Sequence, residues 1–258
     1  MLVIKPFGET PNQLLDKIKK SNKNITKISF AGRLDPMASG LMYILKNEEC
    51  KYQSKIINLD KSYRFSLILG IETLSMDCLS NKIKITNVPK FIDFDIIKTH
   101  IQSFNDKKFL QKFPPFSSKY VRNVKNENHP LWWWTKNKRS DEIKIPSKMV
   151  HIKNIKIINS KFVKLKNIID KFISKIDLVT HDGFNKETIL KIWEKIQDID
   201  FDTNLIEIDI QIDVSTGTYI RQLAHDIGKY FGFGGIAFDI FRNKIGDYSI
   251  LQNSPLVP

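Results

Sequence analysis

The chain has very little cysteine, with only Cys50 and Cys78 among its 258 residues. Two cysteines cannot form a disulfide framework, and neither lies at metal-ligand spacing from another cysteine or a histidine. We interpret both as small, half-buried apolar residues of a protein from a reducing compartment. The five histidines are scattered, so no metal ligand is expected among them.

Other familiar signals are also missing. No run of about 18 apolar residues is present, and the N-terminus lacks the charged and apolar regions of a signal peptide. We therefore expect no membrane association and a cytoplasmic location, with an organelle left open. The sequence has no glycine-rich phosphate loop, metal cluster or dinucleotide fingerprint, so we expect no cofactor and no metal.

Positive charge is abundant. The chain carries 41 lysines and arginines against 28 aspartates and glutamates, a formal charge of +13. Such an excess favours a polyanionic partner such as RNA, because basic side chains release counterions from phosphates. The alternative is that the charge only improves solubility. Hydrophobic residues make up 41% of the chain, which is sufficient for the core of one large domain.

Hydrophobic periodicity predicts several elements. Thr10, Pro11 and Gln13 have the pattern of a capping box at the start of a helix that ends near Lys20. Alternating apolar and polar residues predict strands over 62–69 and 206–214. Helical spacing predicts further helices, at 93–104, around 220–227, and through Ile189, Ile192, Trp193 and Ile196.

The segment from Phe30 to Met42 contains the most informative residue, Asp35. This carboxylate lies between a leucine and a proline, with Gly32 and Gly40 on either side. The residue before a proline avoids the helical conformation, and glycines permit tight turns. Asp35 is therefore expected on a rigid loop that presents its side chain. An ordinary structural turn is the alternative.

Three more segments resemble those of a known family. They are residues 3–10, with Lys5-Pro6-Phe7-Gly8; residues 60–70, with Lys61-Ser62-Tyr63; and residues 214–228, with Gly217-Thr218-Tyr219-Ile220-Arg221. With the Asp35 loop, their order and spacing strongly resemble the catalytic domain of the TruB family of RNA pseudouridine synthases, from residue 3 to about 250. Arg33-Leu34-Asp35 also resembles other pseudouridine synthase families.

The resemblance implies an α/β (α+β) pseudouridine synthase fold. Its central sheet is mixed and mainly antiparallel, is flanked by helices and has the RNA cleft across it. We expect one catalytic domain over residues 1–258, with an insertion within about 159–203. We expect no C-terminal RNA-binding PUA domain.

The resemblance also implies three catalytic residues. Asp35 matches the catalytic aspartate, which acts as nucleophile or stabilises the glycosyl cation. Tyr63 matches the tyrosine that stacks on the target base, and Arg221 matches the arginine that pairs with the carboxylate and keeps it ionised. The residues alone leave open that Tyr63 is a core aromatic and that Arg221 is a surface residue.

Five further positions are expected to bind substrate. They are Phe30, Arg33, Lys119, Tyr219 and Ile240. Phe30 is a departure, because the family usually has a histidine there that helps to displace the target base. Phenylalanine keeps the flat face for stacking but loses both ring nitrogens.

The segment after Lys119 mixes basic residues with three tryptophans, Trp132 to Trp134. Such mixtures are typical of RNA binding, where lysines neutralise phosphates and aromatic rings stack on bases. We expect Lys136, Lys138 and Arg139 to bind RNA. Reading the triplet as a strand places Trp133 on the face opposite Trp132 and Trp134, with some of the tryptophans in the core.

These features predict a cofactor-free isomerase, expected to be a monomer. It would convert uridine to pseudouridine in structured RNA, by resemblance the T-loop uridine of tRNA or of a tRNA-like stem-loop. One alternative is a noncatalytic RNA-binding protein or RNA chaperone that retains this fold, which the altered residue Phe30 keeps open. Another is a TruB-like enzyme acting on mRNA or rRNA.

Overall fold

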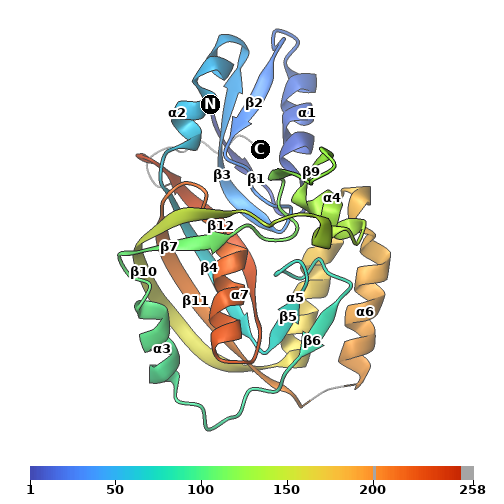
Figure 1. The fold of residues 1–258 in the computed structure, drawn as a ribbon, viewed down its shortest axis with the longest axis vertical. Helices are drawn as coiled ribbons and strands as arrows, with labels where there is room; N and C mark the ends of the chain where they lie inside the picture. Colours follow the sequence, from blue (N-terminus) through green and yellow to red (C-terminus); the bar gives the residue numbers. More distant parts are fainter. Residues whose placement is uncertain (200–201, 251–258) are drawn as a thin grey trace.

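A large central sheet organises the computed structural model, which describes residues 1–199 and 202–250. Its strands follow the order β1-β3-β12-β4-β11-β10-β7, with β2 added beside β3 and β13 beside β12. Strands β12 and β3 run parallel, and the other neighbouring pairs are antiparallel. The expectation of a mixed, mainly antiparallel sheet flanked by helices is confirmed (Figure 1).

The strands of this sheet are β1 (Leu2–Lys5), β2 (Ile28–Ala31), β3 (Ala38–Lys46), β4 (Lys61–Leu69), β7 (Lys107–Lys112), β10 (Ser147–Lys164), β11 (Asn204–Val214), β12 (Gly235–Ile245) and β13 (Tyr248–Ser249). Two small sheets pair β5 (Ile71–Thr73) with β6 (Ile83–Ile85) and β8 (Tyr120–Arg122) with β9 (Asn128–Pro130). The α-helices are α1 (Pro11–Ser21), α2 (Gln53–Ile57), α3 (Phe94–Gln102), α4 (Leu131–Lys136), α5 (Leu165–Asp177), α6 (Lys186–Ile199) and α7 (Ile220–Tyr230). Short 3-10 turns occupy η1 (Asn47–Tyr52), η2 (Ser140–Glu142) and η3 (Asp182–Phe184).

Helix α1 begins as its capping box predicts. The Gln13 backbone N–H donates to Thr10 Oγ1 at 3.2 Å, and the Thr10 backbone N–H donates to Gln13 Oε1 at 2.8 Å. These reciprocal bonds satisfy two N–H groups that a helix start leaves unpaired. Pro11 takes the first helical position, where its missing N–H has no cost.

The sheet is buried on both faces near the end of β4. Phe65, Leu67 and Leu69 belong to one core, which also contains residues of α7 and α3. Ile68 points the other way, into a second core with Phe172 of α5. The alternation over residues 62–69 correctly predicts the strand. Helices α5 and α6 cover the face of the sheet toward which Ile68 points.

The segment over 159–203 adds the end of β10 and the helices α5 and α6. The predicted helix through Ile189 and Trp193 is α6, and the Trp193 indole N–H donates to the Cys78 carbonyl at 3.0 Å. Residues 200 and 201 of the expected insertion lie outside the described residues. In the described parts of the chain, no helix combines the length and apolar character needed to cross a membrane.

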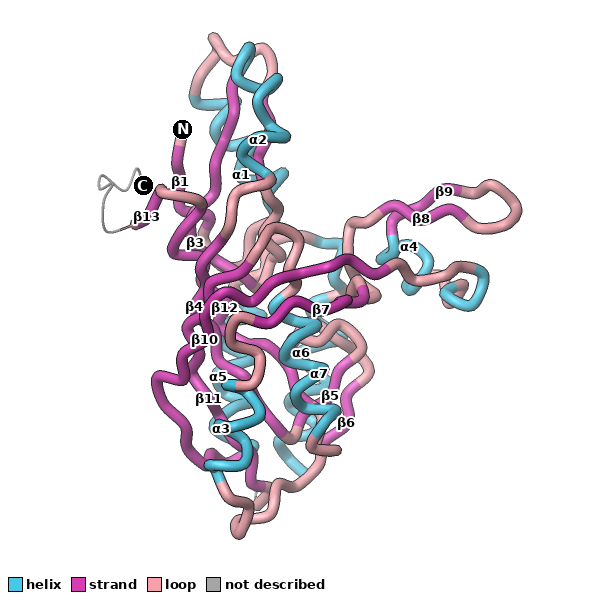
Figure 2. The backbone as a smooth tube through the Cα atoms, turned by 60° about the vertical axis from the view of Figure 1, so that its left-hand side comes forward, coloured by secondary structure: helices cyan, strands magenta, loops and turns pink. Residues whose placement is uncertain are grey.

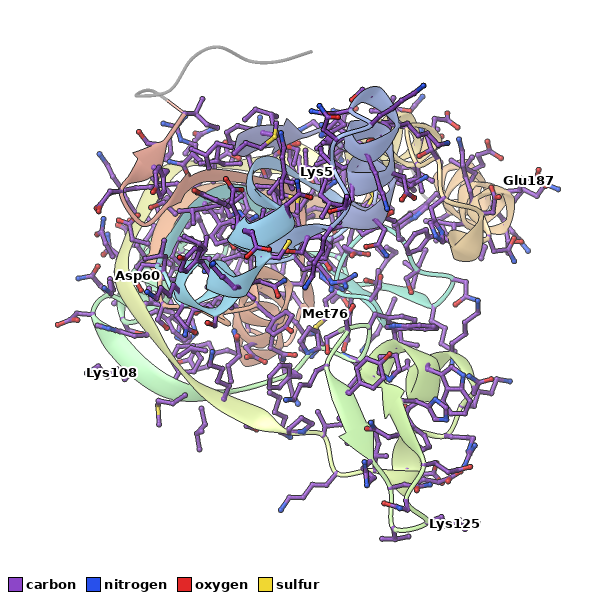
Figure 3. The ribbon with its side chains drawn as sticks, turned by 90° about the horizontal axis from the view of Figure 1, so that it is seen from above. Lys5, Asp60, Met76, Lys108, Lys125 and Glu187 are labelled. Carbon is purple, nitrogen blue, oxygen red and sulfur yellow. The ribbon has the colours of Figure 1, made fainter. Side chains whose placement is uncertain are left out.

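Residues 113–146 form an arm that carries β8, β9 and α4 away from the body (Figure 2). Lys125 lies at its tip, whereas Lys5 lies within the body (Figure 3). The predicted strand through the three tryptophans is wrong, because Leu131–Lys136 is a helix. At helical spacing, Leu131 and Trp134 share the buried face, and Trp132 stays 41% exposed.

Candidate active site

A cavity of about 390 Å³, here called the Asp35 cavity, opens over the central strands β3, β12 and β4. It brings together all the residues expected to be catalytic or to bind substrate. They are Phe30, Arg33, Asp35, Tyr63, Lys119, Tyr219, Arg221 and Ile240. Segments far apart in the sequence therefore meet at one site.

Asp35 lies on the loop between β2 and β3. A hydrogen bond of 3.0 Å, from the Ala38 backbone N–H to the Asp35 carbonyl, closes the loop. The Gly8 N–H also donates to the Pro36 carbonyl, at 2.9 Å. The carboxylate remains 31% exposed, so it is fixed at its base and open to the cavity.

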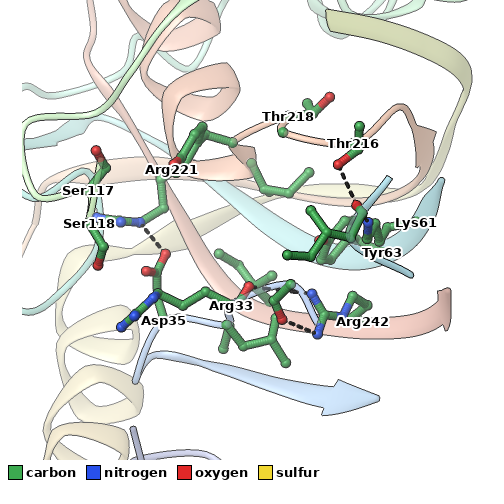
Figure 4. Close-up of a pocket in the computed structure, with 18 of the residues that line it drawn as sticks. Arg33, Asp35, Lys61, Tyr63, Ser117, Ser118, Thr216, Thr218, Arg221 and Arg242 are labelled. Carbon is green, nitrogen blue, oxygen red and sulfur yellow. Dashed lines mark hydrogen bonds and ion pairs between the residues drawn. The ribbon is translucent and has the colours of Figure 1, made fainter. Parts of the chain in front are cut away.

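Arg221, at the start of α7, binds this carboxylate. Its Nε donates to Asp35 Oδ2 at 2.8 Å (Figure 4). Its Nη1 donates to the Ser75 carbonyl at 2.7 Å. Burial alone would lower the pKa of Arg221, but the charges of Asp35 and Asp77 outweigh it and raise that pKa. The ion pair expected between Asp35 and Arg221 is present, and the guanidinium stays charged.

Asp77 is a member of this network to which the sequence analysis gave no role. Its Oδ2 lies 3.5 Å from Arg221 Nη1, and its side chain is only 6% exposed. Burial raises the pKa of Asp77, although Arg221 and the hydroxyl of Ser75 oppose the shift. The available signal was a carboxylate among apolar residues shortly after β5.

Two buried cations lie near Asp35, and neither was assigned a role from the sequence. Arg242 of β12 donates to the carbonyls of Leu41 at 2.7 Å, Gly32 at 3.1 Å and Arg33 at 3.4 Å. Lys5 is fully buried, and burial lowers its pKa to about 8. Its ammonium donates to the carbonyls of Pro6 at 2.8 Å and Glu9 at 2.6 Å. Buried basic residues of this kind need such partners.

Two tyrosines form walls of the cavity. Tyr63 is 8% exposed and belongs to the main core, so it is both a core aromatic and a lining residue. The backbone of Tyr219 is clamped by Gln111, which accepts from its N–H at 2.8 Å and donates to its carbonyl at 3.1 Å. The Phe113 ring packs edge-on against Tyr219, at 5.3 Å between centroids, and burial raises the pKa of Tyr219.

Phe30 and Arg33 form a stacked pair at the cavity edge. The guanidinium carbon of Arg33 lies 5.2 Å from the centroid of the Phe30 ring. The Phe30 carbonyl accepts from Gln53 Nε2 at 2.9 Å, which fixes the backbone beneath the ring. Lys61 also lines the cavity, and burial lowers its pKa to about 8.

The three residues expected to bind RNA through the arm differ in their surroundings. Arg139 binds Glu127 and Glu142, each at 2.5 Å, and lies over the rings of Trp133 and Trp134. Its charge is therefore already balanced. Lys136 and Lys138 are exposed on the arm, outside the lining of the Asp35 cavity. Among the described residues, no group of three or more His, Cys, Asp or Glu side chains is placed to hold a metal ion.

The fold of this chain also occurs in proteins of known structure. Solved chains from a Cbf5–Nop10–Gar1 complex and an archaeal box H/ACA Nop10–Cbf5 complex share this fold, with TM-scores of 0.56 and 0.52 and identities of 18% and 16%. They cover 96% and 99% of this chain, which spans 50% of each solved chain. This chain therefore shares the fold of these solved chains.

The chain belongs to the TruB family: the family model for the N-terminal domain of TruB pseudouridylate synthases matches residues 19–171. The tRNA pseudouridine synthase B of Aquifex aeolicus is 26% identical over 97% of this chain and 69% of its own length. The enzyme of the same name from Clostridioides difficile is 27% identical over 98% and 66%, respectively. That of Chloroherpeton thalassium is 26% identical over 98% and 85%.

Proposed function

We propose that this chain isomerises uridine to pseudouridine in structured RNA, and that its substrate is the T-loop uridine of tRNA. The observation that carries the proposal is the Asp35 carboxylate, open to the cavity and bound to the buried Arg221. The curated relatives are named tRNA pseudouridine synthase B, which supports tRNA as the substrate. We further propose that the chain acts as a monomer in the cytoplasm, without a cofactor.

The reaction replaces one glycosidic bond by another and exchanges one proton between two ring atoms. The ribose C1′–N1 bond breaks, the base turns, and a C1′–C5 bond forms; C5 then loses its proton and N1 gains one. The Asp35 carboxylate supplies the negative charge that stabilises the ribose cation or attacks C1′. The charged Arg221 guanidinium holds that carboxylate in its orientation.

The cavity walls suit a uridine removed from its stack. Base-modifying enzymes reach their target atom by turning the nucleotide out of the helix into a pocket. Tyr63 and Tyr219 offer flat walls, and Phe30 with Arg33 forms a platform at the rim. A protein that only bound RNA would have no need of an Asp35 carboxylate held by the buried Arg221.

The test is the Asp35→Asn variant, which keeps the shape and hydrogen bonding of the side chain but removes its charge. We expect it to bind a T-arm stem-loop RNA like the parent and to form no pseudouridine. Asp95→Asn, at the exposed start of α3, is the matched control and keeps full activity. Appreciable turnover by Asp35→Asn would contradict the proposal that Asp35 is the catalytic residue. Mapping pseudouridines in total RNA with and without the protein separates tRNA from mRNA and rRNA.

A further inference from the structure

In the strand β7, the buried side chain is a glutamine. Gln111 is 2% exposed, whereas Leu110 beside it is 67% exposed. This is the reverse of the usual arrangement, in which the apolar side chain takes the buried position. A buried amide needs partners for both its N–H and its oxygen. The position of Gln111 therefore serves hydrogen bonding more than apolar packing.

The partners of this amide both belong to Tyr219, which follows 108 positions later in the chain. Gln111 Oε1 accepts from the Tyr219 N–H, and Nε2 donates to the Tyr219 carbonyl. The backbone of Tyr219 is extended, with φ −101° and ψ 111°. In this conformation the N–H and C=O of one residue point to the same side, where a neighbouring strand would pair with both. The planar amide takes the place of that strand, and its two bonds fix both the position and the rotation of the Tyr219 backbone.

The clamped residue is the N-cap of α7. Serine, threonine, aspartate and asparagine usually cap helices at this position, because their short side chains carry an oxygen close to the first turn. The tyrosine hydroxyl lies too far along its ring to do so. The two bonds from Gln111 therefore supply a side-chain contact that holds the start of this helix.

Two residues of the Asp35 cavity depend on where α7 begins. Tyr219 lines the cavity, and its clamped backbone sets the direction in which its ring leaves the chain. Arg221 lies two residues later, in the first turn, and its bonds to Asp35 and to the Ser75 carbonyl measure 2.8 and 2.7 Å. These are the lengths of good charge-assisted hydrogen bonds, so a shift of the first turn by about 1 Å would break them.

We propose that Gln111 is a positioning residue of the isomerase, which fixes the start of α7 and thereby aligns Arg221 with Asp35. This inference rests on the proposed function, because the alignment matters only where Asp35 is the reacting carboxylate. Gln111 lies outside the lining of the Asp35 cavity, so it acts through Tyr219 and Arg221 and not on the RNA. Its loss slows the chemical step and leaves RNA binding intact.

The Gln111→Met variant tests this proposal, because methionine keeps the length of the side chain and removes both hydrogen bonds. Its Kd for a T-arm stem-loop RNA and its single-turnover rate at saturating RNA are measured well below its unfolding temperature. We expect the rate to fall about 100-fold, as for a catalytic group misplaced by about 1 Å, and the Kd to stay at the parental value. Gln102→Met, at the exposed end of α3, is the matched control and changes neither value. A parental rate, or a Kd that weakens as much as the rate falls, would overturn the proposal.

A second variant decides the matter if Gln111→Met does not fold. Gln111→Glu has the same shape and keeps an oxygen for the Tyr219 N–H, but its carboxylate cannot donate to the Tyr219 carbonyl. We expect the same split, with a slower rate and an unchanged Kd.

A double-mutant cycle with Arg221→Lys then tests the route through Arg221. If Gln111 acts by aligning the guanidinium, its replacement should cost less once that guanidinium is gone. Losses of rate that simply multiply would show that Gln111 does not act through Arg221 and would also overturn the proposal.

The two proposals fail in different ways. A parent protein that forms no pseudouridine removes the proposed isomerase. A parent that forms pseudouridine at the same rate as its Gln111 variants removes the role of Gln111 alone.

Discussion

At the scale of single residues, Arg221 joins two carboxylates that lie in different segments. Its guanidinium binds Asp35, which faces the cavity, and lies beside Asp77, which is buried. A lysine has one compact charge on a flexible stem and cannot reproduce this forked geometry. The geometry of Asp35 therefore depends on a planar, doubly engaged cation.

Arg221→Ala should lower both stability and activity, because it leaves buried Asp77 without its cation. Removing one partner of a buried ion pair typically costs about 3–5 kcal/mol. Arg221→Lys should lose less free energy of unfolding and retain some turnover. Denaturant unfolding and single-turnover kinetics measure the two effects. Lys51→Ala, which breaks an exposed pair with Glu48, should change stability by less than about 1 kcal/mol. Equal stability of Arg221→Ala and the parent would contradict this account.

Phe30 should assist base displacement by stacking, because its ring faces Arg33 at the cavity edge and has no polar atom. Phe30→Ala is expected to slow turnover on a folded stem-loop by about 10- to 100-fold, the worth of one stacked base. An unstructured oligonucleotide should show a smaller effect, because its uridine is already unstacked. If the variant matches the parent on the stem-loop, Phe30 serves only in packing.

At the scale of elements, the helix α4 determines how the arm presents its tryptophans. Trp134 is fully buried, and its indole N–H donates to the carbonyls of Val121 and His129, at 3.2 and 3.1 Å. These bonds join α4 to the hairpin of β8 and β9. Trp132, two residues earlier, instead lines a second cavity, of about 500 Å³, which lies on the other side of the Asp35 loop.

Trp134→Ala should therefore loosen the arm, since a buried tryptophan replaced by alanine typically costs about 3–5 kcal/mol. Limited proteolysis should cut the variant within residues 113–146 faster than the parent, while the sheet resists. Trp132→Ala, at an exposed position of the same helix, should be cut at the parental rate. Equal protection of the arm in parent and Trp134→Ala would show that the ring does not hold it.

Elements with one regular pattern were predictable from the sequence. Helix α1 follows from its capping box, and β11 follows from alternating isoleucines that are all buried. The helical structure of α4 was not predictable from the tryptophan triplet, because three consecutive apolar residues fit the period of a strand and that of a helix. The contacts of Trp134 with Val121 and His129 on the hairpin determine which face of α4 is buried.

The residues of the candidate site also differ in how far the sequence predicts them. Residues within recognisable motifs, such as Asp35 and Arg221, line one cavity. The partner role of Asp77 depends on its contact with Arg221, which lies more than 140 positions later in the chain. The second cavity is assembled from segments separated by more than a hundred residues, so its existence depends on the tertiary structure.

At the scale of the whole molecule, the excess of positive charge is not uniformly available to a polyanion. Arg139 lies among basic residues of the arm, yet Glu127 and Glu142 balance its charge. Lys136 and Lys138 remain exposed. The arm therefore offers fewer phosphate contacts than its sequence suggests.

Replacing Lys136 and Lys138 together by alanine should reduce the dependence of RNA affinity on salt. Each lost phosphate contact lowers the slope of log affinity against log salt by about 0.7–0.9. Arg139→Ala should leave the slope unchanged and instead destabilise the arm. RNA binding titrations over a range of salt concentrations measure the slopes. An unchanged slope in the double variant would place the RNA elsewhere.

The position of β12 has a consequence for synthesis of the protein on the ribosome. This strand lies between β3 and β4, although it follows them by more than 160 residues, and its Arg242 fixes carbonyls 201 to 210 positions earlier. Until it emerges, the growing chain exposes two unpaired strand edges, which favour mispairing with other chains. The loop of Asp35 also lacks its anchor during that time. Maturation of the catalytic centre is therefore a late, nearly all-or-none event in the life of the nascent chain.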